Sequence, residues 1–335
     1  MPTPVTDFSY ELPEELIAQI PIEPRDSSRL LVLDRHSGEI THRPRFSEII
    51  DELNAGDVLV FNVSKVFNAR LQVDGFEVFI LKVRNGEIDA LVKGSKKLKM
   101  EDGKRKIGDF EMTSKTDDGV VTLKTGRSAL EMFEFCEKRG SVPTPPYVTT
   151  KLTDPERYQT VYAKSIGSVA APTAGLHFTP ELIERARLKG IQIEEVTLHV
   201  GLGTFRPVLA DHIEEHVMHA EFVEINEPTA SRIRTAKIEG RRVIAVGTTT
   251  VRVLEGVFAL FSDLREFSGE INMFIMPGFR FQIISGLITN FHLPKSTLLM
   301  LVSAFAGREN VLSAYQRAVE EKYRFFSFGD AMFIR

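Results

Sequence analysis

The sequence predicts an α/β (α+β) main domain, in which helices pack on a mixed sheet, with an inserted all-β domain that forms a small antiparallel barrel. In the two outer parts of the 335-residue chain, helical patterns alternate with apolar strand patterns, which favours a parallel or mixed sheet covered by helices. Between them, Asp-Gly and Asn-Gly pairs separate β-rich runs, which is typical of hairpins. We expect a main domain over residues 1–64 and 148–335, and an inserted domain with its connector over residues 65–147.

The first segment of the main domain contains short elements separated by turn residues. Ser37-Gly38 is a turn signal, and the Ser47 hydroxyl is suited to cap a helix. The expected elements, in order, are a short helix at Pro13–Ile20, a hairpin of Leu30–Leu33 and Glu39–His42, a helix from Ser47 to Gly56, and a central strand at Val58–Asn62.

The inserted segment is expected to be β-rich because four turn pairs divide it into short runs. Closure into a barrel would hide strand edges that an open sheet of this size exposes. A helical pattern at Ser128–Gly140 follows, and the proline-rich Pro143–Tyr147 is a stiff connector back to the main domain. The turn pairs are Asp74-Gly75, Asn85-Gly86, Asp102-Gly103 and Asp118-Gly119.

After residue 154, strands and helices alternate again, as in the first part of the main domain. Thr179 before Pro180 and Glu181 is a helix start, because a hydroxyl cap, a proline and an acid suit the first turn. The expected helices are Pro180–Lys189, Pro228–Glu239, Ser296–Ala306 and Asn310–Tyr323, and the expected strands are Ile193–Val200, Val243–Val246 and Ile271–Ile275.

The composition is that of an ordinary globular protein, with 43% hydrophobic and 26% charged residues. A formal net charge of −4 gives no global attraction for nucleic acid, so RNA binding would need a local basic surface. The single Cys136 excludes an intramolecular disulfide and suits a reducing compartment. The sequence shows neither a signal region nor an apolar run of membrane length, so we expect a cytoplasmic protein. Without a heptad pattern, we expect a monomer.

Two loops of small residues, each near a histidine, make the segment at residues 168–205 the first candidate site. His177 lies in the loop that contains Thr173 and Gly175, and His199 precedes the loop that contains Gly203 and Thr204. Loops at the carboxyl ends of strands form the ligand crevice of open α/β sheets. The alternative is that glycine and proline only make tight turns here.

Two further segments present polar groups at the start of a helix. In RRVIAVGTTTVRVLE, Thr248 and Thr249 follow a buried strand and Arg252 lies in the first helical turns, which suits an anion or ribose site as well as a simple cap. In LITNFHLPKST, Asn290 and His292 precede the cap Ser296, and a cap alone needs neither. Near the C-terminus, Asp330 lies beside a glycine in an aromatic segment.

A histidine series competes with these segments for function. His212, His216 and His219 are spaced i, i+4 and i+7, so on a helix they could bind zinc together with Glu221. The sequence after residue 218 becomes strand-like, which would break such a helix, so we favour His219 and Glu221 as an acid–base or hydrogen-bonding pair. The Gly-Leu-Gly at residues 201–203 lacks the third glycine and the acid of a dinucleotide-binding fingerprint.

The inserted domain also holds a cluster of basic residues. Such a cluster is either a solvated face of hairpins or a surface that follows RNA phosphates. The cluster comprises Lys93, Lys96, Lys97, Lys99, Lys104, Arg105 and Lys106.

Several of these segments together resemble one family. On the basis of these segments, the chain resembles the S-adenosylmethionine:tRNA ribosyltransferase-isomerases of queuosine biosynthesis. The resemblance extends from Asp7 to the C-terminus and is weakest in the β-rich insert. The matching blocks are residues 170–179 (AAPTAGLHFT), 197–201 with 203–205, 218–221 (MHAE), 246–249 (VGTT), 289–298 (TNFHLPKSTL) and 329–332 (GDAM).

This resemblance implies a transferase that modifies tRNA and uses S-adenosylmethionine as a ribosyl donor. The acceptor would be 7-aminomethyl-7-deazaguanine at the tRNA wobble position, and the products epoxyqueuosine in tRNA, adenine and methionine. S-adenosylmethionine would be consumed, so neither a resident cofactor nor a metal is expected. The catalytic candidates are His177, His199, His219, Glu221, His292 and Asp330. The substrate-binding candidates are Arg25, Asp26, Arg29, Asn62, Thr173, Gly175, Gly203, Thr204, Thr248, Thr249, Arg252, Asn290 and Ser296, and the tRNA-binding candidates are Lys96, Lys97 and Lys99.

One segment departs from the family pattern. After the strand at Val58–Asn62, where the family shows Asn-Asp-Thr-Arg-Val, this chain has Val63 and Lys65 in place of the aspartate and the arginine. Lysine cannot make the bidentate contacts of arginine. Two alternatives from other classes are a zinc hydrolase built on His212, His216 and His219, and a non-catalytic tRNA-binding protein that uses the basic insert.

Overall fold

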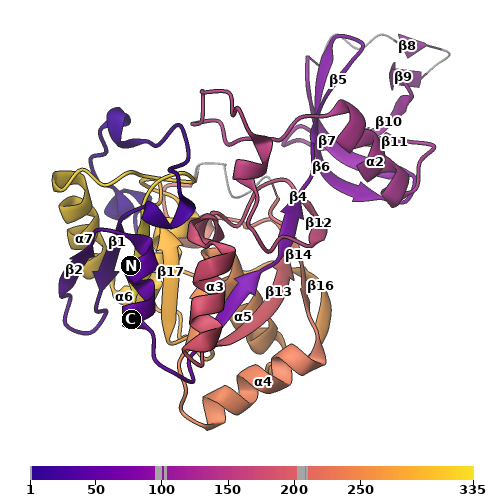
Figure 1. The fold of residues 1–335 in the computed structure, drawn as a ribbon. Coiled ribbons are helices and arrows are strands. Elements are labelled where there is room, and N and C mark those ends of the chain that lie inside the picture. The colour runs from indigo at the N-terminus through magenta and orange to yellow at the C-terminus, as the bar shows by residue number, and fades with distance from the viewer. Residues whose placement is uncertain (1, 95–99, 102–103, 202–207, 209) are drawn as a thin grey trace.

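A nine-stranded mixed sheet forms the centre of the main domain in the computed structural model, which describes residues 2–94, 100–101, 104–201, 208 and 210–335. Figure 1 shows this sheet with helices on both of its faces. In spatial order the strands are β16 (Phe267–Ile271), β14 (Glu221–Ile225), β13 (Gln192–Leu198), β3 (Val58–Asn62), β15 (Val243–Val246), β17 (Gly286–Asn290), β18 (Ala331–Ile334), β1 (Leu30–Leu33) and β2 (Ile40–Arg43).

The four central strands, β13, β3, β15 and β17, are mutually parallel. β3 and β15 are buried at every residue, because both faces of the sheet are covered, and this explains their unbroken apolar sequences. β18 pairs antiparallel with β17 and parallel with β1, so the C-terminal strand joins the N-terminal hairpin to the central strands. The carboxyl ends of the parallel strands therefore meet along one edge.

The helices that cover the sheet begin where the sequence places capping residues. Thr179, Asn226 and Ser296 each accept a hydrogen bond from a backbone N–H in the first turn of the following helix, which satisfies a donor that the helix leaves free. The four helices expected after residue 154 are confirmed. The helices of the main domain are α1 (Ile49–Glu52), α3 (Pro180–Leu188), α4 (Glu227–Ile238), α5 (Thr248–Phe261), α6 (Thr297–Ala306) and α7 (Arg308–Glu320).

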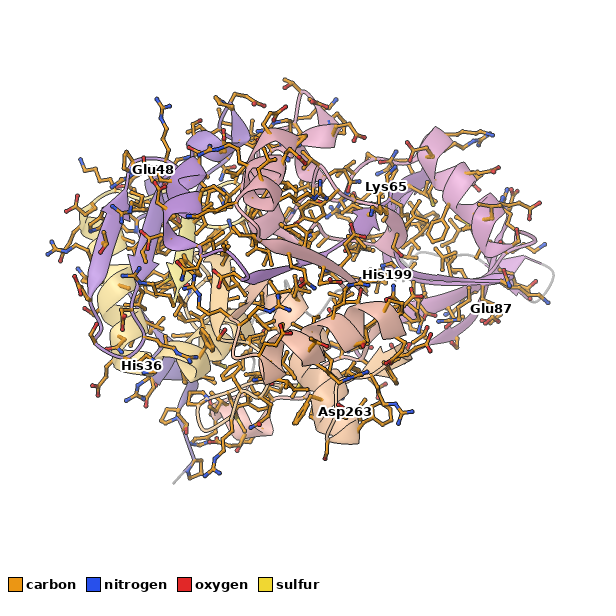
Figure 2. All side chains as sticks on the ribbon, turned by 60° about the horizontal axis from the view of Figure 1, so that its bottom comes forward. His36, Glu48, Lys65, Glu87, His199 and Asp263 are labelled. Atoms are coloured by element: carbon orange, nitrogen blue, oxygen red, sulfur yellow. The ribbon has the colours of Figure 1, made fainter. Side chains whose placement is uncertain are left out.

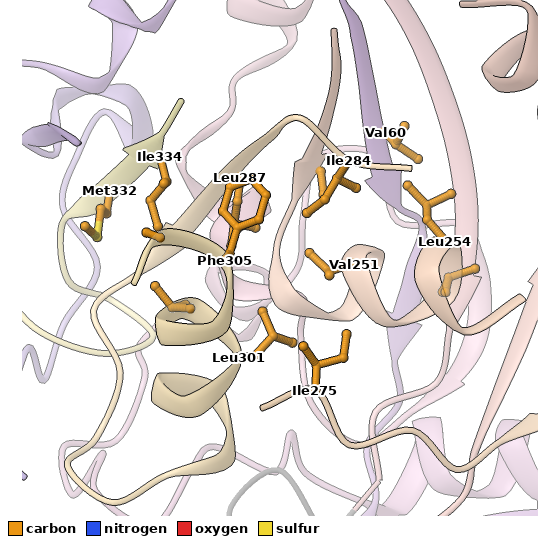
Figure 3. Packing of buried hydrophobic residues seen from close by; sticks show 14 of the residues in the cluster. Val60, Val251, Leu254, Ile275, Ile284, Leu287, Leu301, Phe305, Met332 and Ile334 are labelled. Carbon is orange, nitrogen blue, oxygen red and sulfur yellow. The ribbon is translucent and has the colours of Figure 1, made fainter. Parts of the chain in front are cut away.

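The core lies in two layers, one on each face of the sheet. Along β3, Val58 and Val60 pack into one layer, and Leu59 and Phe61 into the other, because successive side chains of a strand point to opposite faces. Figure 3 shows the first layer, where Val60 lies near residues of α5 and the β17 side chain Leu287 lies above α6. Full burial of one such side chain stabilises the fold by about 1.5–3 kcal/mol.

The β-rich segment forms a separate seven-stranded antiparallel sheet, which Figure 1 shows to one side of the nine-stranded sheet together with α2 (Ala129–Arg139). Hairpin turns at residues 74–75, 85–86 and 118–119 are confirmed, whereas residues 102–103 lie outside the described residues. The pairings run in linear order, so closure into a barrel stays a prediction. The strands, in order, are β5 (Arg70–Val73), β6 (Phe76–Arg84), β7 (Glu87–Lys93), β11 (Val120–Lys124), β10 (Phe110–Lys115), β9 (Lys104–Ile107) and β8 (Met100–Glu101).

A short parallel pair, β4 (Ser64–Val66) and β12 (Ser165–Ser168), lies where the chain leaves and re-enters the main domain. An ion pair between Lys82 of β6 and Glu270 of β16 also joins the two sheets. This agrees with an insert near residues 65–147, but the domain boundaries stay a prediction. No helix in the described part of the chain is long and apolar enough to cross a membrane.

Three of the expected elements are wrong in type or extent. The helix at Pro13–Ile20 is only one turn, because Ile17 and Ala18 pair with Phe325 instead of continuing it. The helix from Ser47 to Gly56 is a 3₁₀ turn followed by the short α1. The strand expected at Ile271–Ile275 lies earlier, as β16, because residues 267–271 pair with β14.

Candidate functional site

A cavity opens at the carboxyl ends of the central parallel strands. Its volume is about 720 Å³, counted with the solvent-filled space at its mouth. Segments far apart in the sequence line it, and they follow β12, β15 and β17 in the chain. The lining comprises residues 170–174, 247–249, 289–293 and 326–327, together with Tyr147, Tyr158, Val200, Ser296 and Leu298.

The loop before α3 is held close to its neighbours by its small residues. A Cβ atom on Gly175 would lie 1.8 Å from the Tyr162 hydroxyl oxygen, so a larger residue does not fit there without movement. Thr173, two residues earlier, lines the cavity and donates a hydrogen bond to Asn290 Oδ1 at 3.0 Å. Gly175 therefore supports the loop, and Thr173 faces the cavity, as its place in the candidate site predicts.

Asn290, the last residue of β17, is fixed by hydrogen bonds on both sides of its amide. Its Nδ2 group donates to the Phe326 carbonyl at 3.2 Å and lies 3.1 Å from His177 Nε2. Its Oδ1 atom accepts from Thr173. Since the amide nitrogen can only donate, His177 Nε2 is the acceptor and carries no proton. The amide that lines the cavity is thus oriented by a histidine behind it.

His177 is buried in this arrangement, with Nδ1 2.7 Å from the Ser28 hydroxyl oxygen. Because Nε2 is unprotonated, Nδ1 carries the ring proton and donates a hydrogen bond to the Ser28 hydroxyl oxygen. Burial, and after it the positive charges of Arg324 and Arg25, lower the His177 pKa to about 3. Near neutral pH the imidazole is therefore uncharged.

His292 lies at the cavity wall itself. Its Nε2 atom is 2.8 Å from the Thr289 hydroxyl oxygen, and its backbone N–H donates to the Tyr315 hydroxyl. Burial lowers the His292 pKa to about 3, so this imidazole is also neutral near pH 7. A neutral imidazole at the wall can form a hydrogen bond with a bound molecule, whereas its low pKa makes it a weak base.

Hydroxyl groups from the start of α5 form another part of the wall. Gly247, just before this helix, has a φ of +90°, which favours glycine because other residues are strained there. Thr248 and Thr249 follow in the lining, and Thr249 accepts a hydrogen bond from Asn62 at 3.2 Å. Asn62 also bonds both backbone groups of Leu198, so it ties β3 to β13 beneath the cavity.

Ser296 has the capping role at α6, where it accepts a hydrogen bond from the Leu299 backbone N–H, and it also lines the cavity.

Arg252 of α5 forms a buried ion pair with Glu221, and Glu221 accepts a hydrogen bond from the Gly201 backbone N–H at 3.1 Å. Glu221 therefore binds Arg252, whereas His219 is exposed and, within the described part of the chain, forms neither a hydrogen bond nor an ion pair with Glu221. The contacts thus pair Glu221 with Arg252 and not, as the sequence suggested, with His219.

His199 lies beside the cavity lining rather than in it. Its ring stacks on Phe222, and a Cβ atom on Gly167 would lie 2.7 Å from its Nε2 atom, whereas the next residue, Val200, faces the cavity. Burial lowers the His199 pKa to about 4, and Nδ1 is buried without a hydrogen-bond partner in the described part of the chain. Figure 2 shows His199 on the side of the main domain where the chain passes to the β-rich sheet.

Asp330 binds backbone groups of its own chain. Its two carboxylate oxygens accept from the backbone N–H groups of Arg29 and Arg324, each at 2.8 Å. Burial raises the Asp330 pKa, and these two bonds oppose the rise. Asp330 thus joins the start of β1 to the segment before β18. The Arg29 guanidinium lies 3.8 Å from the Tyr323 ring centroid.

Other predicted residues lie elsewhere. Arg25 lines a smaller cavity that adjoins the first, and Asp26 follows it, half-buried, in the same turn. Val63 is buried, and Lys65 is exposed on β4. Five predicted residues lie outside the described residues, namely Gly203, Thr204, Lys96, Lys97 and Lys99.

The histidine series that suggested zinc does not form a helical stripe. Only Ile213–Glu215 is helical there, as a single 3₁₀ turn, so the spacing of i, i+4 and i+7 does not place the rings on one side. His212 lies 3.4 Å from Glu215, and His216 packs edge-on against Phe274. Among the described residues, no cluster of three histidine, cysteine or acidic side chains could hold a metal ion.

Several lining residues were not site candidates from the sequence, among them the polar Tyr147, Tyr158 and Ser327. Tyr147 and Ser327 are joined through their hydroxyl groups at 2.7 Å. The Tyr158 hydroxyl is completely buried and has no hydrogen-bond partner in the described part of the chain, although Ser327 and the Ala171 backbone are near enough to affect its pKa. Burial raises that pKa well above its usual value. Tyr147 was recognised only as part of a stiff connector.

With this geometry, comparisons with known proteins identify the family. The family model described as "Queuosine biosynthesis protein" matches residues 5–334. A solved structure described as S-adenosylmethionine tRNA ribosyltransferase from Thermotoga maritima is 40% identical to this chain, with a TM-score of 0.59. The match covers 98% of this chain and 100% of that one. The chain therefore belongs to the queuosine biosynthesis protein family.

Proposed function

We propose that this chain transfers and isomerises the ribosyl moiety of S-adenosylmethionine onto 7-aminomethyl-7-deazaguanine at the tRNA wobble position. The products are epoxyqueuosine-tRNA, adenine and methionine. One observation carries the proposal: three separate segments that carry the family resemblance, residues 170–174, 247–249 and 289–293, line a single cavity at the carboxyl ends of parallel strands. The family match and the 40% identical ribosyltransferase support it.

The reaction needs bond changes that a shaped, neutral site can assist. A new C–N bond joins the substrate amine to one carbon of the ribosyl group, and one further ring bond forms as that group closes to the epoxide. In exchange, the bonds from the ribosyl group to adenine and to the methionine sulfur break. The amine and the carbon next to the sulfonium each lose one proton, of which one ends on adenine and one leaves to solvent. The sulfonium itself acidifies that carbon, so we propose that S-adenosylmethionine is consumed as a substrate and that no resident cofactor takes part.

We assign His292 to direct contact with the substrate, because it lines the cavity and is neutral. With a pKa of about 3 this imidazole is a weak base near neutral pH, so its role is to form a hydrogen bond with the substrate rather than to take up a proton. The hydroxyl groups of Thr248 and Thr249 suit ribose hydroxyls, since each can both donate and accept. His177 acts through Asn290, as a positioning residue, because it fixes the orientation of that amide.

The proposal also includes the expected domain organisation, tRNA contacts, compartment and oligomeric state. The β-rich sheet would be an inserted barrel domain that contacts tRNA through its basic residues, among them Lys96, Lys97 and Lys99. The protein would act in the cytoplasm as a monomer, with tRNA and S-adenosylmethionine as its partners. Neither alternative function gains support, since the zinc series forms no stripe and the family is that of a biosynthetic enzyme.

Product release tests the proposal. Purified protein is incubated with S-adenosylmethionine and tRNA that carries 7-aminomethyl-7-deazaguanine, and adenine and methionine are quantified by chromatography. We expect both products in equal amounts, with the modified tRNA and not with tRNA that carries guanine at the wobble position. If folded protein binds both substrates and releases neither product, the proposal is wrong.

A further inference from the structure

A second, smaller cavity adjoins the one described above. Its volume is about 250 Å³, again counted with the space at its mouth, and Ser327 lines both cavities. Two arginines, Arg25 and Arg157, face it together with the buried His177. The rest of its lining is apolar or glycine, so the guanidinium groups are its main polar feature.

The two arginines are held in place by backbone carbonyls. Arg25 donates to the carbonyls of Gln159 and Glu156, at 2.8 and 3.1 Å, and Arg157 donates from Nη2 to the Ile22 carbonyl at 2.7 Å. Each arginine thus binds the segment that carries the other. These bonds use one hydrogen of each nitrogen that donates, so each guanidinium keeps further N–H groups free for a ligand.

The charged partner of Arg157 lies at the surface. The Arg157 Nε atom lies 2.5 Å from a carboxylate oxygen of Glu23, an ion pair without hydrogen-bond geometry. The Arg157 side chain is only 13% exposed, whereas that of Glu23 is 67% exposed. An ion pair to an exposed carboxylate contributes little, so an anion inside the cavity can compete with Glu23 for this guanidinium.

The positively charged side chains line this cavity, whereas the neighbouring acidic side chains are exposed at the surface. Burial and then the neighbouring Arg157 lower the Arg25 pKa, and Arg324 and Arg25 both lower the pKa of His177. The acids near Arg25 oppose this effect, but all three have exposed side chains. They are Glu23, Asp154 and Glu156. Asp330 is occupied by two backbone N–H groups. An anion in the cavity would relieve the repulsion between the two guanidinium groups.

We infer that this smaller cavity binds an oxyanion, and specifically the carboxylate of the methionyl part of S-adenosylmethionine, an inference that rests on the proposed function. Guanidinium groups bind carboxylates through paired, charge-assisted hydrogen bonds. The substrates offer two kinds of oxyanion, the carboxylate and the tRNA phosphates. The cavity is small, and it adjoins the larger one at Ser327, so a group that belongs to the same bound molecule fits it better than a phosphate on the RNA backbone.

The test compares two ligands that differ only in the carboxylate. Binding of S-adenosylmethionine and of decarboxylated S-adenosylmethionine is measured by calorimetry for the wild type, Arg25→Gln and Arg157→Gln. We expect each variant to bind S-adenosylmethionine about 10- to 100-fold more weakly, the range for a charged hydrogen bond, and to bind the decarboxylated compound with unchanged affinity. Arg25→Lys and Arg157→Lys keep the charge and serve if a glutamine variant does not fold.

Arg234 of α4 provides the matched control. It is half-buried, donates to the Leu264 carbonyl and pairs with Glu227, so it resembles Arg157 in its contacts but lies away from the cavity. Arg234→Gln is expected to leave both affinities unchanged.

Two results would overturn the inference. The first is unchanged binding of S-adenosylmethionine by folded Arg25 and Arg157 variants, which would make these residues a structural clamp. The second is loss of tRNA affinity alone, with a shallower salt dependence by about 0.7–0.9 per lost phosphate contact, which would assign the cavity to RNA. Failure of the proposed function would be seen separately, as a wild type that binds S-adenosylmethionine but releases no adenine.

Discussion

Replacing His177 with glutamine is expected to make the folded protein less sensitive to acid. The His177 pKa is about 3 in the folded protein, against an ordinary value of 6.5, because the imidazole is buried. The unfolded chain therefore binds a proton between these pH values and the folded chain does not. The neutral form stabilises the fold above pH 6.5, and this stability is lost as the pH falls from about 6.5 to about 3.

The size of the effect follows from the pKa difference. One pKa unit corresponds to about 1.4 kcal/mol, so the full loss from His177 is roughly 5 kcal/mol, of which about 2 kcal/mol is lost between pH 7 and pH 5. His292 has the same pKa of about 3 and adds a similar amount. The wild type should thus be destabilised by acid about 2 kcal/mol more than His177→Gln over this interval.

Urea unfolding followed by circular dichroism at pH 7, 6 and 5 measures this difference. The comparison uses the change with pH, so a general loss of stability in the variant does not affect it. His36→Gln, which removes an exposed histidine, is the control and should show the wild-type change. Equal losses in the wild type and His177→Gln between pH 7 and pH 5 would show that His177 is not held neutral by the fold.

Three other substitutions test the contacts around the site, each by urea unfolding at pH 7. Gly175→Ala places a Cβ 1.8 Å from the Tyr162 hydroxyl and should cost about 1–3 kcal/mol; unchanged stability would contradict the close approach. Asp330→Ala leaves two backbone N–H groups without their acceptor and should cost at least about 2 kcal/mol, whereas Asp330→Asn should cost less. Arg252→Met leaves the Glu221 charge buried and should cost about 3–5 kcal/mol, and the further change Glu221→Gln should recover part of it; no recovery would argue against the ion pair.

The central strands and the capped helices could be predicted because their signals are local. Val58–Asn62 and Val243–Val246 are continuous apolar runs, and Thr179 and Ser296 are capping residues at the start of amphipathic or apolar segments. The strands β17 and β18 were missed, because their residues were assigned to the polar segment before α6 and to the aromatic segment around Asp330, and their pairing involves strands far away in the sequence. The helix expected at Pro13–Ile20 failed for the same reason, since a distant segment pairs with its second half.

The site was predicted as a set of polar residues in loops, but not as a network. The sequence indicates His177 and Asn290 separately, yet their hydrogen bond joins residues 113 positions apart and assigns the histidine a supporting place. Tyr158 was missed because its hydroxyl matters only through its burial at the cavity wall. His199 was expected at the site, but its neighbour Val200, and not His199, lines the cavity just after β13.

The fate of the S-adenosylmethionine carbons tests the central claim most directly. Protein and tRNA with 7-aminomethyl-7-deazaguanine are supplied with S-adenosylmethionine that carries one label in the ribosyl group and another in the methyl group, and the tRNA is then digested to nucleosides. Ribosyl transfer predicts that the ribosyl label appears in the modified nucleoside and that the methyl label leaves with methionine. The methyl label in tRNA, or the absence of both labels after the protein has bound both substrates, would contradict it.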